Sequence, residues 1–305
     1  MAGICDGRVV VVTGAGRGIG RGHAIEFARQ GAKVVVNDLG AEVDGTGSSA
    51  GPAGQVVEEI RGMGAEAVAN GEDISDWDGA KRLIDSAVET FGGLDVVVNN
   101  AGILRDRMLV NMTEAEWDAV IRVHLRGTFA PMRHAAEYWR NRSKAGESND
   151  ARIINTTSPS GIYGNVGQAN YGAAKAGIAS MTVISAMELG RYGVTVNAIA
   201  PAALTRMTEN LGFAEGSAGL KPDEFDPNDP DNIAPLVVWL GSPASADITG
   251  RVFNVHGGHI SVAEGWVAGP GADKDDRWES AELGDVIPGL VAKAAPNANM
   301  LGRRG

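Results

Sequence analysis

Short runs of apolar, mostly β-branched residues recur along the chain and alternate with longer stretches in which apolar positions follow a helical period. The short runs predict strands, at residues 9–12, 33–37, 65–69, 94–98, 152–156, 194–199 and 251–255. The longer stretches predict helices, at residues 19–30, 52–61, 77–91, 114–140, 169–190 and 233–240. Nearly continuous valine and isoleucine runs indicate strands that are covered on both faces, as in a parallel sheet. Their alternation with helices, through right-handed crossovers, predicts an α/β fold with a doubly wound sheet.

Two stretches depart from this alternation. Residues 39–54 are rich in glycine and serine, which predicts a long loop after the second strand. Residues 205–231 are weakly patterned, and because unstructured segments of that length are often lids, we expect a substrate lid there. The strand–helix pattern does not start again afterwards. We therefore expect a single domain over residues 1–260 and a C-terminal extension over residues 261–305, whose aromatic residues pack on this subunit or on a neighbour.

Charge and composition narrow the class of protein. The net charge is −11, which argues against nucleic acid as a main partner because phosphate backbones require a basic face. The single cysteine, Cys5, has no partner for an internal disulfide, which fits a reducing cytoplasm. No apolar run reaches membrane-spanning length, and we expect neither a signal peptide at residues 1–8 nor a peroxisomal address at residues 301–305. The histidines lack the spacing of metal ligands, so no metal site is expected.

The turn between the first strand and the first helix, residues 13–20, carries four glycines. Glycines let the backbone turn tightly and approach a pyrophosphate, and the start of the helix supplies free N–H groups. An ordinary glycine-rich turn is the alternative, but the strand before it and the helix after it favour a dinucleotide site. The residues expected to contact the cofactor in this turn are Gly14, Arg17, Gly18, Ile19 and Gly20.

The ends of the next strands supply further cofactor residues. Asp38 ends the second strand, where a carboxylate accepts hydrogen bonds from the adenosine ribose and repels a 2′-phosphate. Arg17 would favour NADP instead, because a guanidinium pairs with a 2′-phosphate. The alternative is that Arg17 is a solvated side chain at the helix start. On balance we expect NAD rather than NADP. Asp73 and Ile74 follow the third strand and Asn100 follows the fourth, although each also fits an ordinary turn.

Tyr171 and Lys175 lie four residues apart at the start of a predicted helix and therefore share one face. A nearby cation favours the phenolate, so Tyr171 is suited to exchange a proton with an alcohol or a forming alkoxide. A surface tyrosine and lysine on an amphipathic helix fit the same spacing. However, the fifth strand ends just before this helix, and ligands bind at this edge of such a sheet. Ser158 or Ser160, in the intervening segment, is placed to bind the substrate oxygen.

Taken in chain order, these motifs resemble the short-chain dehydrogenase/reductase family over residues 7–260. The matching positions are Thr13, Gly14, Gly18, Gly20, Asn99, Asn100, Ala101, Gly102, Ser158, Tyr171 and Lys175. The resemblance implies a seven-stranded parallel sheet of the Rossmann type. It implies Ser158 as partner of the substrate oxygen, Tyr171 as acid/base and Lys175 as its activator. It also implies a homodimer or homotetramer, packed through residues 114–140 and 169–190.

Two positions depart from the family pattern. Many members carry a catalytic asparagine where this chain has His124. The family residue holds a helix kink whose backbone carbonyl binds a relay water, and a carbonyl is available from His124 as well. A packed interior histidine is the alternative. The common Pro-Gly pair is Pro201-Ala202 here, and Thr205 lies one residue closer to the proline than the usual threonine.

Longer strings of residues are similar to the dehydrogenase domain of the peroxisomal D-bifunctional proteins, also called 17β-hydroxysteroid dehydrogenase type 4. These strings are residues 36–40, 100–107, 122–127, 160–165 and 167–171. The resemblance implies NAD-dependent oxidation of a 3-hydroxyacyl-CoA to a 3-ketoacyl-CoA, in the breakdown of fatty acids or sterol side chains. In those proteins the domain is fused to a hydratase, so here we expect a separate hydratase as partner.

Three alternatives stay open. The first is a 17β-hydroxysteroid dehydrogenase acting on a free steroid. The second is a 3-ketoacyl carrier-protein reductase, which should prefer NADPH and lack the Asp38 carboxylate. The third is a dinucleotide-sensing protein without catalysis, against which the intact set of Ser158, Tyr171 and Lys175 argues, since a sensor needs no acid/base pair.

Overall fold

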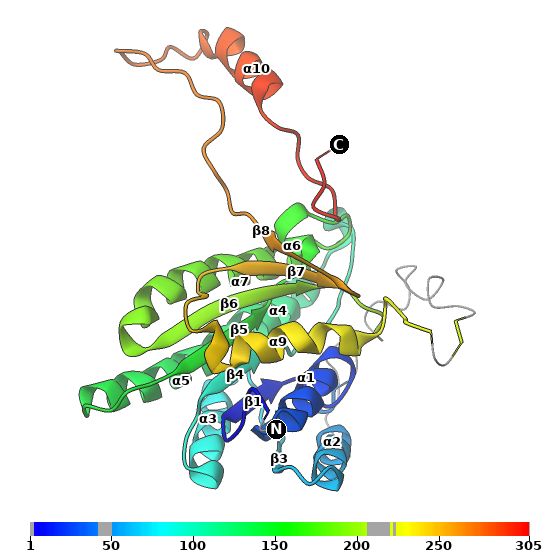
Figure 1. The fold of residues 1–305 in the computed structure, drawn as a ribbon. Coiled ribbons are helices and arrows are strands. Elements are labelled where there is room, and N and C mark those ends of the chain that lie inside the picture. The colour runs from blue at the N-terminus through cyan, green and yellow to red at the C-terminus, as the bar shows by residue number, and fades with distance from the viewer. Residues whose placement is uncertain (1–2, 42–50, 206–219, 222–223, 305) are drawn as a thin grey trace.

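Within the described residues, which are 3–41, 51–205, 220–221 and 224–304 of a computed structural model, the strands form one eight-stranded sheet (Figure 1). Its order is β3-β2-β1-β4-β5-β6-β7-β8. The strands are β1 (Val9–Thr13), β2 (Lys33–Asn37), β3 (Ala67–Asn70), β4 (Val96–Asn99), β5 (Ala151–Thr156), β6 (Val194–Pro201), β7 (Val252–His256) and β8 (His259–Ala263). The strands β1 to β7 pair in parallel, and the order reverses between β1 and β4. The doubly wound, seven-stranded parallel sheet predicted from the sequence is therefore confirmed.

The eighth strand was not predicted. β8 pairs antiparallel with β7 through the register His256↔His259, so a two-residue turn joins the strands. That turn is Gly257-Gly258, and Gly257 has a φ of 51°, a left-handed conformation that glycine adopts without strain. A Gly-Gly pair between two short apolar runs is a hairpin signal, and it was present in the sequence. β8 runs across the boundary between residues 260 and 261, where we expected the C-terminal extension to start.

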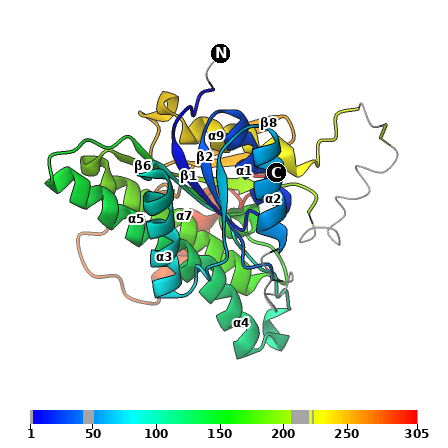
Figure 2. The ribbon, with the colours of Figure 1, turned by 90° about the horizontal axis from the view of Figure 1, so that it is seen from below.

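Helices cover both faces of the sheet (Figure 2). Side chains of α1, α2 and α9 form one apolar core with the strands, and side chains of α3, α5 and α7 form a second core on the other face. Within β1 the valines alternate between these two cores, which is why the strand is apolar at every position. The α-helices are α1 (Gly18–Arg29), α2 (Gly51–Gly62), α3 (Trp77–Phe91), α4 (Glu114–Ile121), α5 (Gly127–Lys144), α6 (Pro159–Tyr163), α7 (Ala169–Leu189), α9 (Ala234–Gly241) and α10 (Leu283–Lys293).

Side-chain caps fix the starts of two helices around the site. The Asp76 carboxylate accepts a hydrogen bond from the Gly79 amide at 2.7 Å and so begins α3. Thr113 and Glu116 cap α4 reciprocally, each side chain accepting from the other residue's amide at 3.2 and 2.9 Å. These caps satisfy N–H groups that have no partner inside a helix. Because of them, α3 and α4 start at defined residues.

The single long helix predicted over residues 114–140 is interrupted in the structure. α4 ends at Ile121, Arg122–Arg126 form a π-helical turn, and α5 follows. At the centre of the turn, the His124 ring contacts the main chain of Ile103, 21 residues earlier. A contact of that sequence separation leaves no trace in helical periodicity, which predicted one continuous helix. The family resemblance did imply a helix kink at His124, and the π-helical turn lies there. Single π-helical turns are frequent at functional sites.

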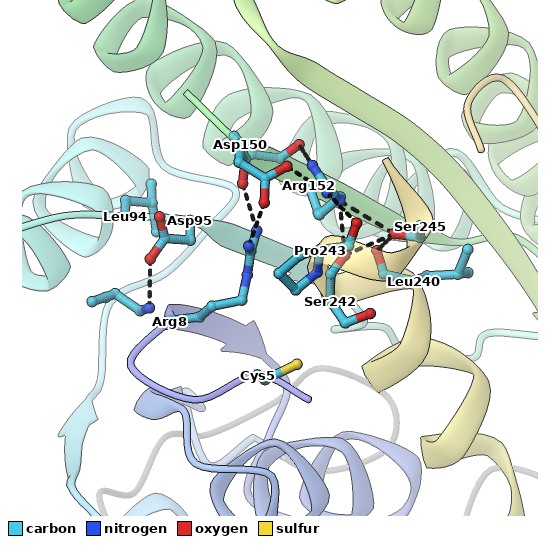
Figure 3. A network of polar contacts seen from close by, with 12 residues as sticks. Cys5, Arg8, Leu94, Asp95, Asp150, Arg152, Leu240, Ser242, Pro243 and Ser245 are labelled. Atoms are coloured by element: carbon cyan, nitrogen blue, oxygen red, sulfur yellow. Dashed lines mark hydrogen bonds and ion pairs between the residues drawn. The ribbon is translucent and has the colours of Figure 1, made fainter. Parts of the chain in front are cut away.

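A cluster of charged residues ties β1 to β5 at the edge of the sheet opposite the glycine-rich turn (Figure 3). The Asp150 carboxylate pairs with Arg8 Nη1 at 2.8 Å and with Arg152 Nη2 at 2.5 Å. Arg152 is 1% exposed, and its Nε also donates to the Ser242 carbonyl and the Ser245 hydroxyl, both at 3.2 Å. The cluster therefore joins the amino ends of two strands to the turn after α9. We refer to Arg8, Asp150 and Arg152 below as the amino-edge clamp.

After β8 the chain leaves the sheet and later returns to it (Figure 1). Most residues from 264 to 304 are exposed, and α10 buries none of its side chains against the described residues. The chain comes back to α6, where a Cβ on Gly302 would lie 2.7 Å from the Tyr163 hydroxyl oxygen.

Parts of two predicted segments lie outside the described residues. They are residues 42–50 of the loop after β2, and residues 206–219 and 222–223 of the predicted lid. In the remaining chain, the structure contains no helix that is both long and apolar enough to cross a bilayer.

Candidate active site

A cavity of about 430 Å³ opens at the carboxyl ends of the central strands. The turn after β1, the segments after β2 to β5 and the start of α7 all contribute to its wall. Tyr171 and His124 line it, and Ser158 follows the lining residue Thr157 and lies close enough to Tyr171 to affect the pKa of the phenol. Every residue expected to contact the cofactor also lines it: Gly14, Arg17, Gly18, Ile19, Gly20, Asp38, Asp73, Ile74, Asn100 and Lys175. The fold thus brings the candidate catalytic and cofactor residues to one place.

At Gly14 and Gly20 the glycine-rich turn has no room for a side chain. Gly14 has a φ of 63°, and a Cβ there would lie 2.7 Å from the Ala101 Cα. A Cβ on Gly20 would lie 2.1 Å from the Gly14 carbonyl oxygen. α1 begins at Gly18 without a side-chain cap, so its first N–H groups are available to a phosphate. The turn therefore fits the pyrophosphate of a bound dinucleotide.

Asn100 holds this turn from the side. Its Nδ2 donates to the carbonyl oxygens of Thr13 and Gly14 at 3.1 and 3.2 Å. Its own amide donates to the Thr13 hydroxyl at 3.0 Å. The side chain of Asn100 therefore supports the backbone that faces the cofactor.

Asp38 is fixed by main-chain amides on both sides. Its Oδ2 accepts from the Gly16 amide at 2.8 Å, and its Oδ1 accepts from the Gly40 amide at 2.7 Å. The carboxylate therefore keeps one orientation at the wall of the cavity. Arg17 is exposed at the N-cap of α1 and lines the same cavity.

Asp73, after β3, lies in a polar cluster at the wall of the cavity. Its Oδ1 accepts from the amide and hydroxyl of Ser75 at 2.8 and 2.6 Å, and Arg122 Nη2 pairs with its Oδ2 at 3.1 Å. Burial acts to raise the pKa of Asp73, but these hydrogen bonds and the Arg122 charge outweigh it and lower the pKa. Sequence analysis did not single out Arg122, which links the segment after β3 to the π-helical turn.

Lys175 and Tyr171 meet inside the protein, on one face of α7. Lys175 is 3% exposed and its Nζ donates to the Thr156 carbonyl at 2.6 Å. The same Nζ lies 5.5 Å from the centre of the Tyr171 ring. This juxtaposition matches the arrangement predicted from the four-residue spacing.

Burial dominates the ionisation of both groups. It raises the pKa of Tyr171 to about 12, against the lowering effect of the hydrogen bond with Ser158. It lowers the pKa of Lys175 to about 7. The sequence suggested that a cation beside the phenol lowers its pKa, but in the protein alone the loss of hydration is the larger effect.

The structure separates the two candidate serines. Ser158 is the N-cap of α6, its Oγ accepting from the Ser160 amide at 3.1 Å, and its hydroxyl acts to lower the pKa of Tyr171. Ser160 instead donates from its hydroxyl to Gln168 at 2.7 Å. Ser158 is therefore the serine that lies beside the phenol.

His124 packs its ring edge-on against Tyr171, with the centroids 5.1 Å apart. Its Nε2 lies 2.8 Å from the Ile103 carbonyl oxygen and 3.1 Å from the Ile103 amide. One ring nitrogen either donates or accepts, so it satisfies one of these groups at a time. An asparagine has a donor and an acceptor and satisfies both. Burial lowers the pKa of His124 to about 3, so the ring is neutral and its side chain supports the π-helical turn.

Asn170, which sequence analysis quoted only as part of a longer string, holds the start of α7. It is fully buried, and its Nδ2 donates to the carbonyl oxygens of Arg105 and Glu116 at 3.0 and 3.2 Å. Its Oδ1 accepts from the Tyr171 amide at 2.8 Å. The position of this asparagine, directly before Tyr171, was the only feature of the sequence that could have indicated its role. Among the described residues, no cluster of histidine, cysteine or carboxylate side chains is suited to hold a metal ion.

The fold and the site together define the class of dehydrogenases and reductases that use NAD or NADP. The chain belongs to the short-chain dehydrogenase family, whose sequence model "short chain dehydrogenase" matches residues 8–215. The family resemblance drawn from the motifs is therefore confirmed.

Individual relatives narrow this class. Hydroxyacyl-CoA dehydrogenase ChsB1 of Mycobacterium tuberculosis is 48% identical over 263 residues, which are 84% of this chain and 80% of that protein. Peroxisomal multifunctional enzyme type 2 of Mus musculus is 43% identical over 282 residues, 92% of this chain but 34% of the longer relative. A crystal structure of a short chain dehydrogenase from Mycobacterium avium is 57% identical and has a TM-score of 0.87, covering 97% of this chain and 98% of that one. The chain is thus homologous to hydroxyacyl-CoA dehydrogenases.

Proposed function

We propose that the protein oxidises a 3-hydroxyacyl-CoA to the 3-ketoacyl-CoA with NAD, in the breakdown of fatty acids or sterol side chains. The observation that carries the proposal is the convergence of Tyr171, Ser158 and Lys175 at the cavity, in a chain whose relative ChsB1 is a hydroxyacyl-CoA dehydrogenase. A buried phenol beside a hydroxyl is suited to proton exchange with a secondary alcohol.

The site residues divide the chemistry between them. Ser158 donates a hydrogen bond to the C3 oxygen of the alcohol and holds it beside Tyr171, which takes the hydroxyl proton as a phenolate. Lys175, anchored on the Thr156 carbonyl, places an ammonium near the phenol and stabilises the phenolate. The cavity residues would hold a nicotinamide cofactor, which when oxidised would supply the hydride acceptor for C3 and a positive charge that favours the phenolate. The hydroxyl proton goes to Tyr171.

The preference for NAD follows from Asp38. Because both carboxylate oxygens are held by main-chain amides, Asp38 presents a fixed negative charge where a 2′-phosphate would lie. Arg17 is exposed and solvated, so it offers a weaker attraction to that phosphate. Replacing Asp38 by alanine is therefore expected to reduce the ratio of NAD to NADP usage.

The test is a substrate panel with the purified full chain. Short, medium and branched 3-hydroxyacyl-CoA esters and a free 17β-hydroxysteroid are each offered with NAD and with NADP. We expect turnover of CoA esters with NAD. Turnover of the steroid alone would assign a hydroxysteroid dehydrogenase instead. A preference for NADPH with a 3-ketoacyl carrier protein would assign the reductase.

We also propose that the chain forms a homo-oligomer through α5 and α7. Ile184 and Met187 on α7 are 48% and 75% exposed, and arginines and glutamates of α5 and of the end of α7 flank them. A face that combines apolar side chains with both signs of charge is self-complementary about a twofold axis. Light scattering should give a dimer or tetramer mass, and Met187→Asp should lower it. A monomeric wild-type protein at assay concentration excludes this assembly.

A further inference from the structure

One buried amide side chain near Tyr171 has no part in the mechanism described so far. Gln168 is 5% exposed and precedes α7, three residues before Tyr171. Its Nε2 donates to Asp106 Oδ2 at 2.7 Å. Its Oε1 accepts from the Ser160 hydroxyl at 2.7 Å and from Asn165 Nδ2 at 3.0 Å. The amide nitrogen of Gln168 therefore has an acceptor, and its amide oxygen has two donors.

These bonds connect the segments that surround the phenol. Ser160 belongs to the α6 turn, and its amide holds the Ser158 hydroxyl oxygen at 3.1 Å. Asp106 belongs to the segment after β4, which also joins the turn before α7 through the Arg107 amide and the Gly167 carbonyl at 2.8 Å. One side chain thus links the serine turn, the segment after β4 and the start of the tyrosine helix.

A glutamine suits this position for a chemical reason. Asp106 requires a donor and the Ser160 hydroxyl requires an acceptor, and an amide supplies one of each. A glutamate at position 168 would set a second carboxylate at hydrogen-bond distance from Asp106, where loss of hydration already raises the pKa, and like charges there are destabilising. Glutamine at position 168 therefore satisfies both neighbours, whereas a glutamate of the same shape does not.

We propose that Gln168 and Asp106 are positioning residues: Gln168 fixes the Ser158 turn against Tyr171, and through the same amide it fixes the Asp106 carboxylate near the phenol. The inference rests on the roles proposed above for Ser158 and Tyr171, and not on the identity of the acyl substrate.

The charged and titratable groups that face Tyr171 come from four segments. They are Lys175 on α7, His124 on the π-helical turn, Ser158 before α6 and Asp106 after β4. His124 is neutral above about pH 3. The negative charge of Asp106 raises the pKa of Tyr171. Removing that charge therefore favours the phenolate, which is the form required for alcohol oxidation.

Two substitutions separate geometry from charge. Gln168→Glu keeps the shape but sets two carboxylates against each other, so we expect kcat to fall at least tenfold while KM changes little. Asp106→Asn retains an acceptor for Gln168 and removes only the charge. We expect it to keep most of kcat and to shift the acid limb of the oxidation pH profile to lower pH, by up to about one unit. A residue with a merely structural role would not shift that limb.

The double variant is the rescue. In Gln168→Glu/Asp106→Asn, the amide introduced at position 106 donates to the carboxylate introduced at position 168, and the Ser160 hydroxyl still finds an acceptor. We expect kcat to recover at least half of the loss. The matched control is Gln55→Glu, the same change at an exposed position of α2, with wild-type kinetics expected. Unchanged kcat in Gln168→Glu, or no rescue in the double variant, overturns the proposal.

The assays use acetoacetyl-CoA with NADH and 3-hydroxybutyryl-CoA with NAD. If the wild-type enzyme turns over neither substrate, the proposed substrate class is not supported. The role of Gln168 is then judged by crystallography. The structure of Gln168→Glu should show the Ser158 hydroxyl displaced from Tyr171. If the Ser158–Tyr171 pair is unchanged in that structure, Gln168 does not position it.

Discussion

Two histidines, His23 and His124, are at most 1% exposed and are uncharged, and they differ in how their ring nitrogens are hydrogen-bonded. His124 shares its Nε2 with the main chain of Ile103. His23, on α1, has no hydrogen-bond partner for either ring nitrogen within the described part of the chain. Burial lowers the pKa of each ring to about 3. Both rings are therefore neutral in the folded protein at any pH at which it functions. Because the buried rings do not take up a proton that the unfolded chain does, the folded protein loses stability in acid.

This gives a prediction for acid stability. An unfolded histidine titrates near pH 6.5, so between about pH 6.5 and 3 the unfolded state takes up a proton that the folded His23 does not. The contribution of the neutral His23 ring to the free energy of unfolding is complete above pH 6.5 and is lost as the pH falls. His23→Leu should remove it, so that the drop in unfolding free energy from pH 7 to pH 5 is about 2 kcal/mol smaller than in the wild type. Urea denaturation at both pH values measures this drop. The same drop in the variant and the wild type would argue against a buried neutral ring, and exposed His259→Leu is the control.

Tyr171 gives the second residue-scale prediction. Tyr171→Phe removes the hydroxyl that we propose exchanges the proton, while leaving the ring that packs against His124. We expect kcat to fall by about 10²-fold or more, with NADH affinity unchanged. Steady-state kinetics and fluorescence titration with NADH report the two quantities. Retained turnover would show that another group carries the proton.

At the scale of elements, a helix or strand was predicted correctly where residues close together in the sequence determine it. The strands from β1 to β7 and helices such as α1 and α3 were predicted to within a few residues, because burial of their side chains dictates the period. Helical periodicity missed the π-helical turn, because the turn depends on the contact between His124 and Ile103, and only the family resemblance implied a kink at this position. The Gln168 network was hidden for the same reason, since it joins Gln168 to Asp106, 62 residues earlier. Motifs of fixed spacing located Tyr171 and Lys175 without any such knowledge.

The amino-edge clamp gives a prediction at this scale. Asp150→Asn leaves two buried guanidiniums without their shared carboxylate, and Arg152 is nearly inaccessible to water. Because Asp150 is half exposed and partly screened, we expect a loss of about 1–2 kcal/mol in unfolding free energy. Urea denaturation at pH 7 measures the loss, with exposed Asp275→Asn as the matched control.

The clamp also has a pH signature with a definite sign. Burial acts to raise the pKa of Asp150, but the hydrogen bonds and charges of Arg8 and Arg152 outweigh it, so the folded pKa lies below the unfolded one. The stabilisation is therefore present above about pH 4 and is lost as the pH falls through the folded pKa. If Asp150→Asn and the wild type differ equally at pH 7 and pH 3, the carboxylate charge is not what stabilises the clamp.

At the scale of the whole molecule, the cavity connects the ends of β1 to β5, so a ligand there stabilises the sheet as a unit. A cofactor present at a hundred times its dissociation constant adds about 2.7 kcal/mol to the folded state. We expect NAD to raise the melting temperature by several degrees and NADP at the same concentration to raise it less. Thermal denaturation with each cofactor tests this, and Asp38→Ala should narrow the difference. Equal shifts in the wild type would exclude Asp38 as the discriminating residue.

The path of the last residues has a practical consequence for handling the protein. The carboxyl-terminal segment returns to the helix that Ser158 begins, whereas the amino-terminal segment lies against the end of α1, at the far edge of the sheet (Figure 1). Because the backbone at Gly302 packs against the Tyr163 hydroxyl, a bulky group at that position would crowd the short helix that begins at Ser158. Attachment points for kinetic work are therefore better chosen away from Gly302, for example near Gly3 beside the end of α1.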